Sequence, residues 1–179
     1  MSDDICGLRG FASGLAAAAL LALMLTCASA RAANVAVCAG TESVDYTPAL
    51  KLATQSGTIA NSDAFTCTSN DPGAASGTTA NAFPASYSCL GPLGEIGDEG
   101  QQTIAWADAT TSVIDAALFT DNAVGGQYTF ITTGTVTAGK FAGATATETV
   151  VLPTLSALQC LTTGIGHVSG PLTMTIAGA

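Results

Sequence analysis

The feature that most constrains the fold is a two-residue alternation of side chains over residues 126–137. One face carries the larger or more apolar side chains, whereas the other face is mostly threonine. Successive side chains of a β-strand point to opposite faces of the sheet, and threonine and valine favour strands. The segment is therefore predicted to be a strand whose inner face carries Tyr128, Phe130, Thr132, Gly134 and Val136.

The alternation recurs along the chain, with Gly, Asn, Asp and Pro between the periodic segments. A turn at Gly139 is predicted to join this strand to a partner at residues 140–151, forming a long hairpin. Near the C-terminus, Leu172, Met174 and Ile176 are predicted to point inward. Further strands are predicted at residues 34–38, 42–47, 63–68, 86–90, 103–107, 112–119 and 156–161.

Three segments fit this pattern less simply. Residues 112–119 also fit a short helix, although the threonines before them and the aromatic end favour a strand. Residues 70–84 and 91–100 lack periodicity and are predicted to be loops. Many short antiparallel strands separated by turns suit either a sandwich or a barrel. We expect an all-β fold, a single antiparallel β-sandwich (immunoglobulin-like or related) of about 8–10 strands.

The N-terminal region has the pattern of an export signal. Residues 11–25 form an apolar run that is shorter than the roughly 20 residues needed to span a bilayer. Small residues follow at Ala28, Ala30 and Ala32, giving two overlapping A-x-A cleavage sites. Residues 1–32 are therefore predicted to be a cleaved signal peptide, and residues 33–179 a secreted, extracellular or cell-surface domain. An acidic start, Asp3 and Asp4, leaves an uncleaved anchor or a misassigned start codon as alternatives.

Four cysteines lie beyond the predicted signal peptide, at Cys38, Cys67, Cys89 and Cys160. An even number in an exported chain indicates two disulfides, for which three pairings exist. Because Cys67 and Cys89 flank a polar segment, we expect the pairs Cys67–Cys89 and Cys38–Cys160. No C-x-x-C motif occurs, and the spacing does not indicate a zinc site.

The charge balance limits the classes of partner that this chain can bind. The formal net charge is −9, and the only lysines after residue 32 are Lys51 and Lys140, with no arginine. Such a chain repels phosphate backbones and anionic lipid, so we expect neither nucleic-acid binding nor attraction to an anionic membrane. No apolar run after residue 32 is long enough for a transmembrane segment.

An acidic loop is one candidate ligand-facing site. Glu95, Asp98 and Glu99 lie together in a Gly-rich segment. Clustered carboxylates suit Ca²⁺, but these acids lack the alternating spacing that surrounds one ion. A solvated acidic turn is therefore the preferred interpretation, and no metal or other cofactor is predicted.

The aromatic residues are a second candidate. Trp106 and Tyr87 are candidate ligand-facing residues for a sugar, with core packing as the competing interpretation. His167, the one histidine, is predicted to face water because its parity is opposite to that of Leu172 and Met174. No G-x-S-x-G motif accompanies it, so no catalytic residue and no enzymatic activity are predicted.

Residues 134–143 (Gly-Thr-Val-Thr-Ala-Gly-Lys-Phe-Ala-Gly), residues 157–161 and the terminal Gly-Pro-Leu-Thr-Met-Thr-Ile resemble small secreted β-rich proteins of actinobacteria, which are mostly uncharacterised. The resemblance is strongest over roughly the last 50 residues. It implies an extracellular β-sandwich with Gly139 in a turn and Phe141 anchoring the returning strand, and it transfers no catalytic residue. Composition and signal are also similar to those of the enediyne-carrying apoproteins, whose cysteine spacings differ.

These observations predict a non-enzymatic secreted or cell-surface protein that acts by binding. The expected partner is a cell-envelope glycan, another protein or a second copy of the chain. A carrier of a small apolar molecule is the alternative, and a hydrolase with an unrecognised site is the third hypothesis.

Overall fold

The computed structural model describes residues 35–89, 100–124 and 127–178, with backbone alone for residue 35 and for 117–124. These residues lie within one compact unit, Ala32–Ala179. The elements are β1 (Val35–Leu50), β2 (Gln55–Ser69), the 3₁₀ helix η1 (Pro72–Ala74), β3 (Ser76–Tyr87), β4 (Gln101–Trp106), β5 (Thr111–Val124), β6 (Gln127–Gly139), β7 (Thr145–Leu152), α1 (Ala157–Leu161) and β8 (Ile165–Ala177).

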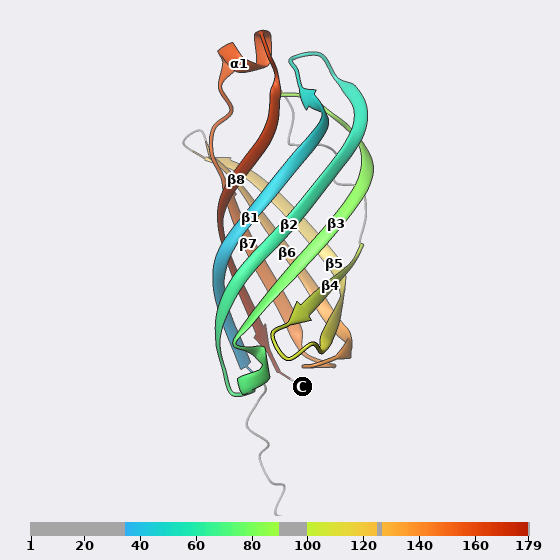
Figure 1. Ribbon diagram of the computed structural model, residues 1–179, viewed down its shortest axis with the longest axis vertical. Helices are drawn as coiled ribbons and strands as arrows, with labels where there is room; N and C mark the ends of the chain where they lie inside the picture. Colours follow the sequence, from blue (N-terminus) through green and yellow to red (C-terminus); the bar gives the residue numbers. More distant parts are fainter. Residues whose placement is uncertain (1–34, 90–99, 125–126, 179) are drawn as a thin grey trace, which may run out of the picture. The chain divides into compact units, whose positions relative to one another are not determined.

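Each strand pairs antiparallel with the next one, and β8 pairs with β1, so the sheet closes into an eight-stranded barrel (Figure 1). The closing ladder is long and runs from the Val35–Ala177 pair to the Asp45–His167 pair. The predicted β-sandwich is therefore wrong, although the all-β class is confirmed. Alternation assigns each side chain to a face, but it does not show that the first strand bonds to the last one.

The predicted hairpin is confirmed as β6 and β7, with Phe130, Gly134 and Val136 buried on the inner face. Gly139 has a φ of 82°, a left-handed conformation in which a side chain would be strained. In β8, Leu172, Met174 and Ile176 are buried as predicted.

Several predicted boundaries are wrong. The two predicted strands at 34–38 and 42–47 are one strand, β1, and much of the predicted loop at 70–84 belongs to β3. The predicted strand at 156–161 is the helix α1, which begins after Ser156, whose side chain accepts a hydrogen bond from the Gln159 amide. Residues 112–119 are confirmed as part of a strand, β5. Most of the predicted loop at 91–100 lies outside the described residues.

The disulfides join Cys38 to Cys67 and Cys89 to Cys160, so the predicted pairing is wrong for both bonds. Cys38 and Cys67 are direct register partners on β1 and β2, with Cα atoms 4.0 Å apart. Cys67 lies near one end of β2, whereas Cys89 follows β3 at the opposite end of the barrel. The twelve residues of β3 span roughly 40 Å at about 3.3 Å per residue, which keeps these two cysteines apart.

Two disulfides are typical of proteins from oxidising compartments. Within the described ranges, no helix has the length and apolar character that a membrane-crossing helix requires.

The two ends of the barrel interior are apolar. At the end that carries η1, Phe65, Trp106 and Phe141 pack edge to face, with centroid separations of 6.0 and 5.7 Å. Gly77 makes room for the Phe65 ring, because a Cβ atom there would lie 2.7 Å from it. At the end that carries α1, the buried side chains include Tyr46, Leu50, Tyr87, Leu152 and Ile165.

Candidate binding site

Between these apolar ends, the barrel interior holds a layer of polar side chains. It comprises Glu42 on β1, Asn61 and Asp63 on β2, Thr79 on β3, Gln102 on β4 and Glu148 on β7, and we call it the carboxylate layer. Register places Glu42 opposite Asp63, and Asp63 opposite Thr79, so these three residues form a row across three strands. Five strands thus bring together residues that are far apart in the sequence.

Few donors serve the carboxylates of this layer. The Thr79 hydroxyl donates to Asp63 Oδ2, and the side chain of Asn61 hydrogen-bonds to Glu42. The Gln102 amide nitrogen lies 3.4 Å from both Asp63 Oδ2 and Glu148 Oε2. These two contacts are long for hydrogen bonds. The Gln102 amide therefore bridges the two carboxylates by weak hydrogen bonds.

Two acceptor atoms of the layer are buried and have no hydrogen-bond partner among the described residues. They are Asp63 Oδ1 and Asn61 Oδ1. Asp63 itself is only 6% exposed. Since a buried polar atom without a partner costs about 1–3 kcal/mol, this pair of orphan acceptors calls for a physical explanation.

The lysines of the described residues make their contacts at the ends of the barrel. The Lys140 amine lies 2.6 Å from Asp71 and 3.0 Å from Asp108, next to η1. The Lys51 amine donates to the Thr162 carbonyl, next to α1. Both lysines thus make these contacts away from the carboxylate layer, and no cationic side chain of the described residues pairs with its carboxylates.

The carboxyl groups hold protons at unusually high pH. Burial, together with the charges of Asp63 and Glu148, raises the pKa of Glu42 to about 8. Burial and the charge of Asp63 raise the pKa of Glu148 to about 7, and burial also raises the pKa of Asp63. Near neutral pH, the layer is therefore poised to gain or lose protons in response to a nearby charge.

Solvent reaches this layer although its side chains point into the barrel. Glu42, Gln102 and Glu148 are partly exposed, and Asn81, which pairs with Asn61, is exposed despite its inward register position. The β3–β4 ladder contains just two pairs in the described residues, at Gly77 and Thr78 of β3. Among the described residues, β3 therefore has no β4 ladder partner beyond Thr78, next to the carboxylate layer.

The residues predicted to face a ligand do not form a surface site. Trp106 and Tyr87 are 4% and 1% exposed, so the competing interpretation, core packing, is the observed one. The Trp106 ring nitrogen donates to the Ser112 hydroxyl at 2.8 Å, and the Tyr87 hydroxyl donates to the Pro48 carbonyl. The acidic loop with Glu95, Asp98 and Glu99 lies outside the described residues.

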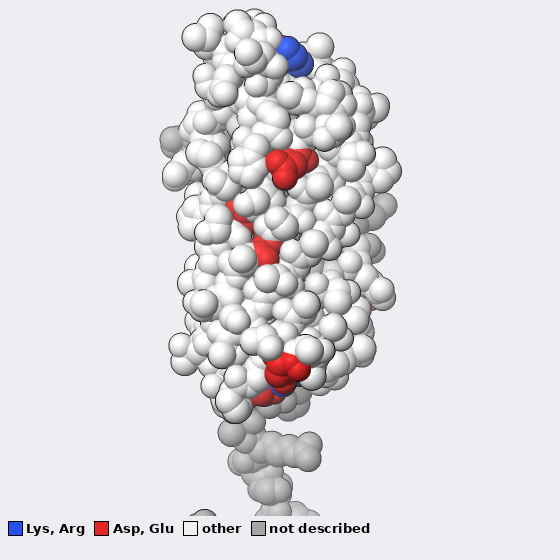
Figure 2. Space-filling view, viewed as in Figure 1, with Lys and Arg blue, Asp and Glu red and all other residues white. Residues whose placement is uncertain are grey.

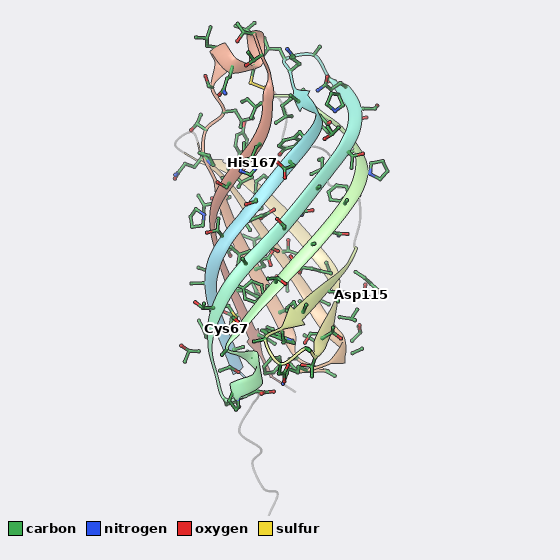
Figure 3. The ribbon with its side chains drawn as sticks, viewed as in Figure 1. Cys67, Asp115 and His167 are labelled. Atoms are coloured by element: carbon green, nitrogen blue, oxygen red, sulfur yellow. A yellow bond between two sulfur atoms is a disulfide. The ribbon has the colours of Figure 1, made fainter. Side chains whose placement is uncertain are left out.

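His167 lies on the outer face of β8, where its Nδ1 atom is 2.8 Å from Asp45 Oδ1 (Figure 3). More than half of its side chain is exposed, which agrees with the predicted outward orientation. In the described part of the chain, no three His, Cys, Asp or Glu side chains are spaced to hold one metal ion.

A shallow groove lies on the outer surface over β1 to β4. Its volume is about 620 Å³, and small outward residues such as Ala39, Ala64 and Thr78 line it. The face of the molecule seen in Figure 2 is almost entirely uncharged, with a few separate acidic groups and a basic group near its upper end. The groove has therefore no charged or protruding aromatic group that would orient a ligand.

The carboxylate layer was not predicted from the sequence, although the alternation of side chains places Glu42 and Asp63 at inward positions. Glu42 shares the parity of Val44 and Tyr46, two buried residues of the same strand. Asp63 likewise shares the parity of Phe65. An acid at an inward position of an alternating strand is the signal that could have located this site.

Comparison with family models, with curated proteins and with solved structures gave no match. The class of protein is thus defined by the structure itself, as a disulfide-bonded, eight-stranded antiparallel barrel with a polar interior layer.

Proposed function

We propose that this protein is an exported, non-enzymatic binding protein whose ligand is a small molecule held inside the barrel at the carboxylate layer. The observation that carries the proposal is the pair of orphan acceptors, Asp63 Oδ1 and Asn61 Oδ1, in a layer that solvent reaches. A closed eight-stranded barrel has an interior wide enough to be filled by side chains or to hold one small ligand. A ligand that donates hydrogen bonds would satisfy these acceptors.

Binding explains the arrangement better than catalysis does. A hydrolase site needs a nucleophile or an activated water beside a base and a stabilising donor. His167 is separated from the layer by the barrel wall, because it lies on the outer face with Asp45. The carboxylate layer offers acceptors and protons, which suit recognition of a donor-bearing molecule.

A second candidate is a cell-envelope glycan bound in the groove over β1 to β4, because this groove is a hollow of about 620 Å³ on the outer face. Sedimentation of the purified protein with isolated cell walls would support this candidate. Retention that survives changes in the carboxylate layer would assign the binding to the outer surface.

Native mass spectrometry of protein secreted by its own host tests the proposal. We expect an added small mass that disappears on denaturation and that is reduced in Glu42→Gln and Glu148→Gln variants. Asp45→Asn, which removes an exposed carboxylate from the outer face of β1, is the matched control and should retain the mass. A clean unliganded mass, with no adduct after incubation with concentrated host medium, would contradict an interior ligand.

A further inference from the structure

The hydrogen-bonding inventory of the carboxylate layer indicates the chemistry of its ligand. Glu42, Asp63 and Glu148 present six carboxylate oxygens when ionised, and Asn61 Oδ1 adds a further acceptor. The described donors are the Thr79 hydroxyl and the amides of Asn61 and Gln102. Acceptors thus outnumber donors, so a complementary ligand must be rich in N–H or O–H groups.

We infer that the ligand is a small primary amine, bound as its ammonium ion between the carboxylates of Glu42, Asp63 and Glu148. This inference rests on the proposed function and specifies its ligand class. An ammonium group is compact, carries three N–H donors and supplies the positive charge that the layer lacks. The three carboxylates come from β1, β2 and β7, which suits a head group with three diverging donors better than a planar guanidinium fork.

The packing on either side of the layer sets the direction of the rest of the ligand. Toward η1, the interior is filled by Phe65 and Trp106, which are both 4% exposed, and by their neighbours. Toward α1, the inward residues Phe83, Ala85 and Tyr128 are only partly buried. The apolar part of the amine therefore extends toward the α1 end of the barrel.

Ammonium binding is linked to proton release from the layer. Glu42 faces Asp63, Glu148 and Tyr46, and Glu148 faces Asp63, so the described titratable groups around each glutamate are acids or a phenol. A bound cation favours the ionised form of every one of these groups. Binding near neutral pH should therefore release protons to the buffer, which a purely apolar ligand would not cause.

Calorimetric titration of the secreted protein with n-hexylammonium chloride tests this inference. We expect hexylammonium to bind with net proton release, measured in two buffers of different ionisation enthalpy. 1-Hexanol, which lacks the charge, and hexyltrimethylammonium, which lacks N–H donors, should bind about ten- to a hundredfold more weakly, because a hydrogen bond to a charged group contributes about 1.5–3 kcal/mol.

Variants test whether hexylammonium binds at the carboxylate layer. Glu42→Gln, Glu148→Gln and Asp63→Asn should each weaken hexylammonium binding about tenfold or more, whereas Asp45→Asn should leave it unchanged. Glutamine has the shape of a protonated glutamate, so Glu148→Gln serves as the test if Asp63→Asn does not fold. Equal binding in all variants would overturn the inference.

The controls distinguish a failure of the amine ligand class from a failure of the proposed function. If hexanol binds as tightly as hexylammonium and the native protein still carries a small mass, the interior site stands but the amine class is wrong. If none of the three probes binds and the native mass is clean, the proposed function itself fails.

Discussion

Asp63 on β2 and Glu148 on β7 are bridged by one donor, the Gln102 amide nitrogen, which lies 3.4 Å from an oxygen of each. Both residues are inward-facing acids on strands that are not neighbours in the sheet. Their proximity exists because the sheet closes, and it is the central element of the carboxylate layer.

The carboxylate layer predicts a stability that falls as the pH rises. The folded-state pKa values of Glu42 and Glu148, about 8 and 7, lie above the ordinary value of 4.5. Between pH 4.5 and 8, the unfolded chain therefore binds fewer protons than the folded chain, so the free energy of unfolding decreases by a few kcal/mol and then levels off. Urea unfolding at pH 5, 7 and 9 measures this.

Matched variants test whether this pH dependence arises from Glu42 and Glu148. Glu42→Gln combined with Glu148→Gln should flatten the pH dependence, because the neutral amides cannot ionise. Asp115→Asn, at an exposed position on β5 (Figure 3), should keep the wild-type profile. A wild-type stability that rises between pH 5 and 9 would refute the raised pKa values.

The aromatic packing at the η1 end depends on one buried hydroxyl. Ser112 is fully buried, accepts from the Trp106 ring nitrogen and donates to the Lys140 carbonyl at 2.7 Å. Ser112→Ala leaves both groups without this partner and should lower the free energy of unfolding by about 1–3 kcal/mol. Chemical unfolding followed by tryptophan fluorescence measures the loss, and Ser169→Ala, at an exposed position, should cost much less.

The disulfide pairing has a direct chemical test. Non-reducing peptide mapping should recover Cys38 with Cys67 and Cys89 with Cys160. The second bond closes a sequence separation of 71 residues, so replacing both of its cysteines by serine should cost about 4 kcal/mol in the chain-entropy model. A peptide that links Cys67 to Cys89 would be incompatible with the barrel.

Lys140 contributes to the lowered pKa of Asp108 at the η1 end. Hydrogen bonds from Thr110 and from Lys140 lower the pKa of Asp108 to about 2. Lys140→Gln should therefore raise the pKa of Asp108 toward its ordinary value, which carboxyl NMR titration measures. The stability that this depressed pKa contributes is lost as the pH falls from about 4 toward 2. The variant should consequently show a smaller loss of stability over that range than the wild-type protein.

Local pattern predicted much of the barrel wall. The alternation through Phe130 and Val136, the turn at Gly139 and the inward set from Leu172 to Ile176 all follow from side-chain parity, which is a local property. β3 was missed because its inward positions include Gly77, Thr79 and Asn81, which are too small or too polar to produce an apolar period.

The remaining features depend on contacts between distant residues. Closure pairs Val35 with Ala177, and no local pattern specifies which strands meet. The cysteine pairing follows from the strand register that places Cys38 opposite Cys67, which spacing alone does not show. The helix α1 has five residues, a length at which periodicity does not separate a helix from a strand.

Carboxyl NMR of protein labelled with ¹³C at the glutamate side chains tests the central claim most directly. Resonances assigned to Glu42 and Glu148 through their glutamine variants should titrate near pH 8 and 7 in the free protein. Saturating hexylammonium should move both titrations to lower pH, whereas 1-hexanol should leave them in place. If both glutamates titrate near 4.5 and the amine does not move them, the interior carboxylate layer is not a binding site for a cation.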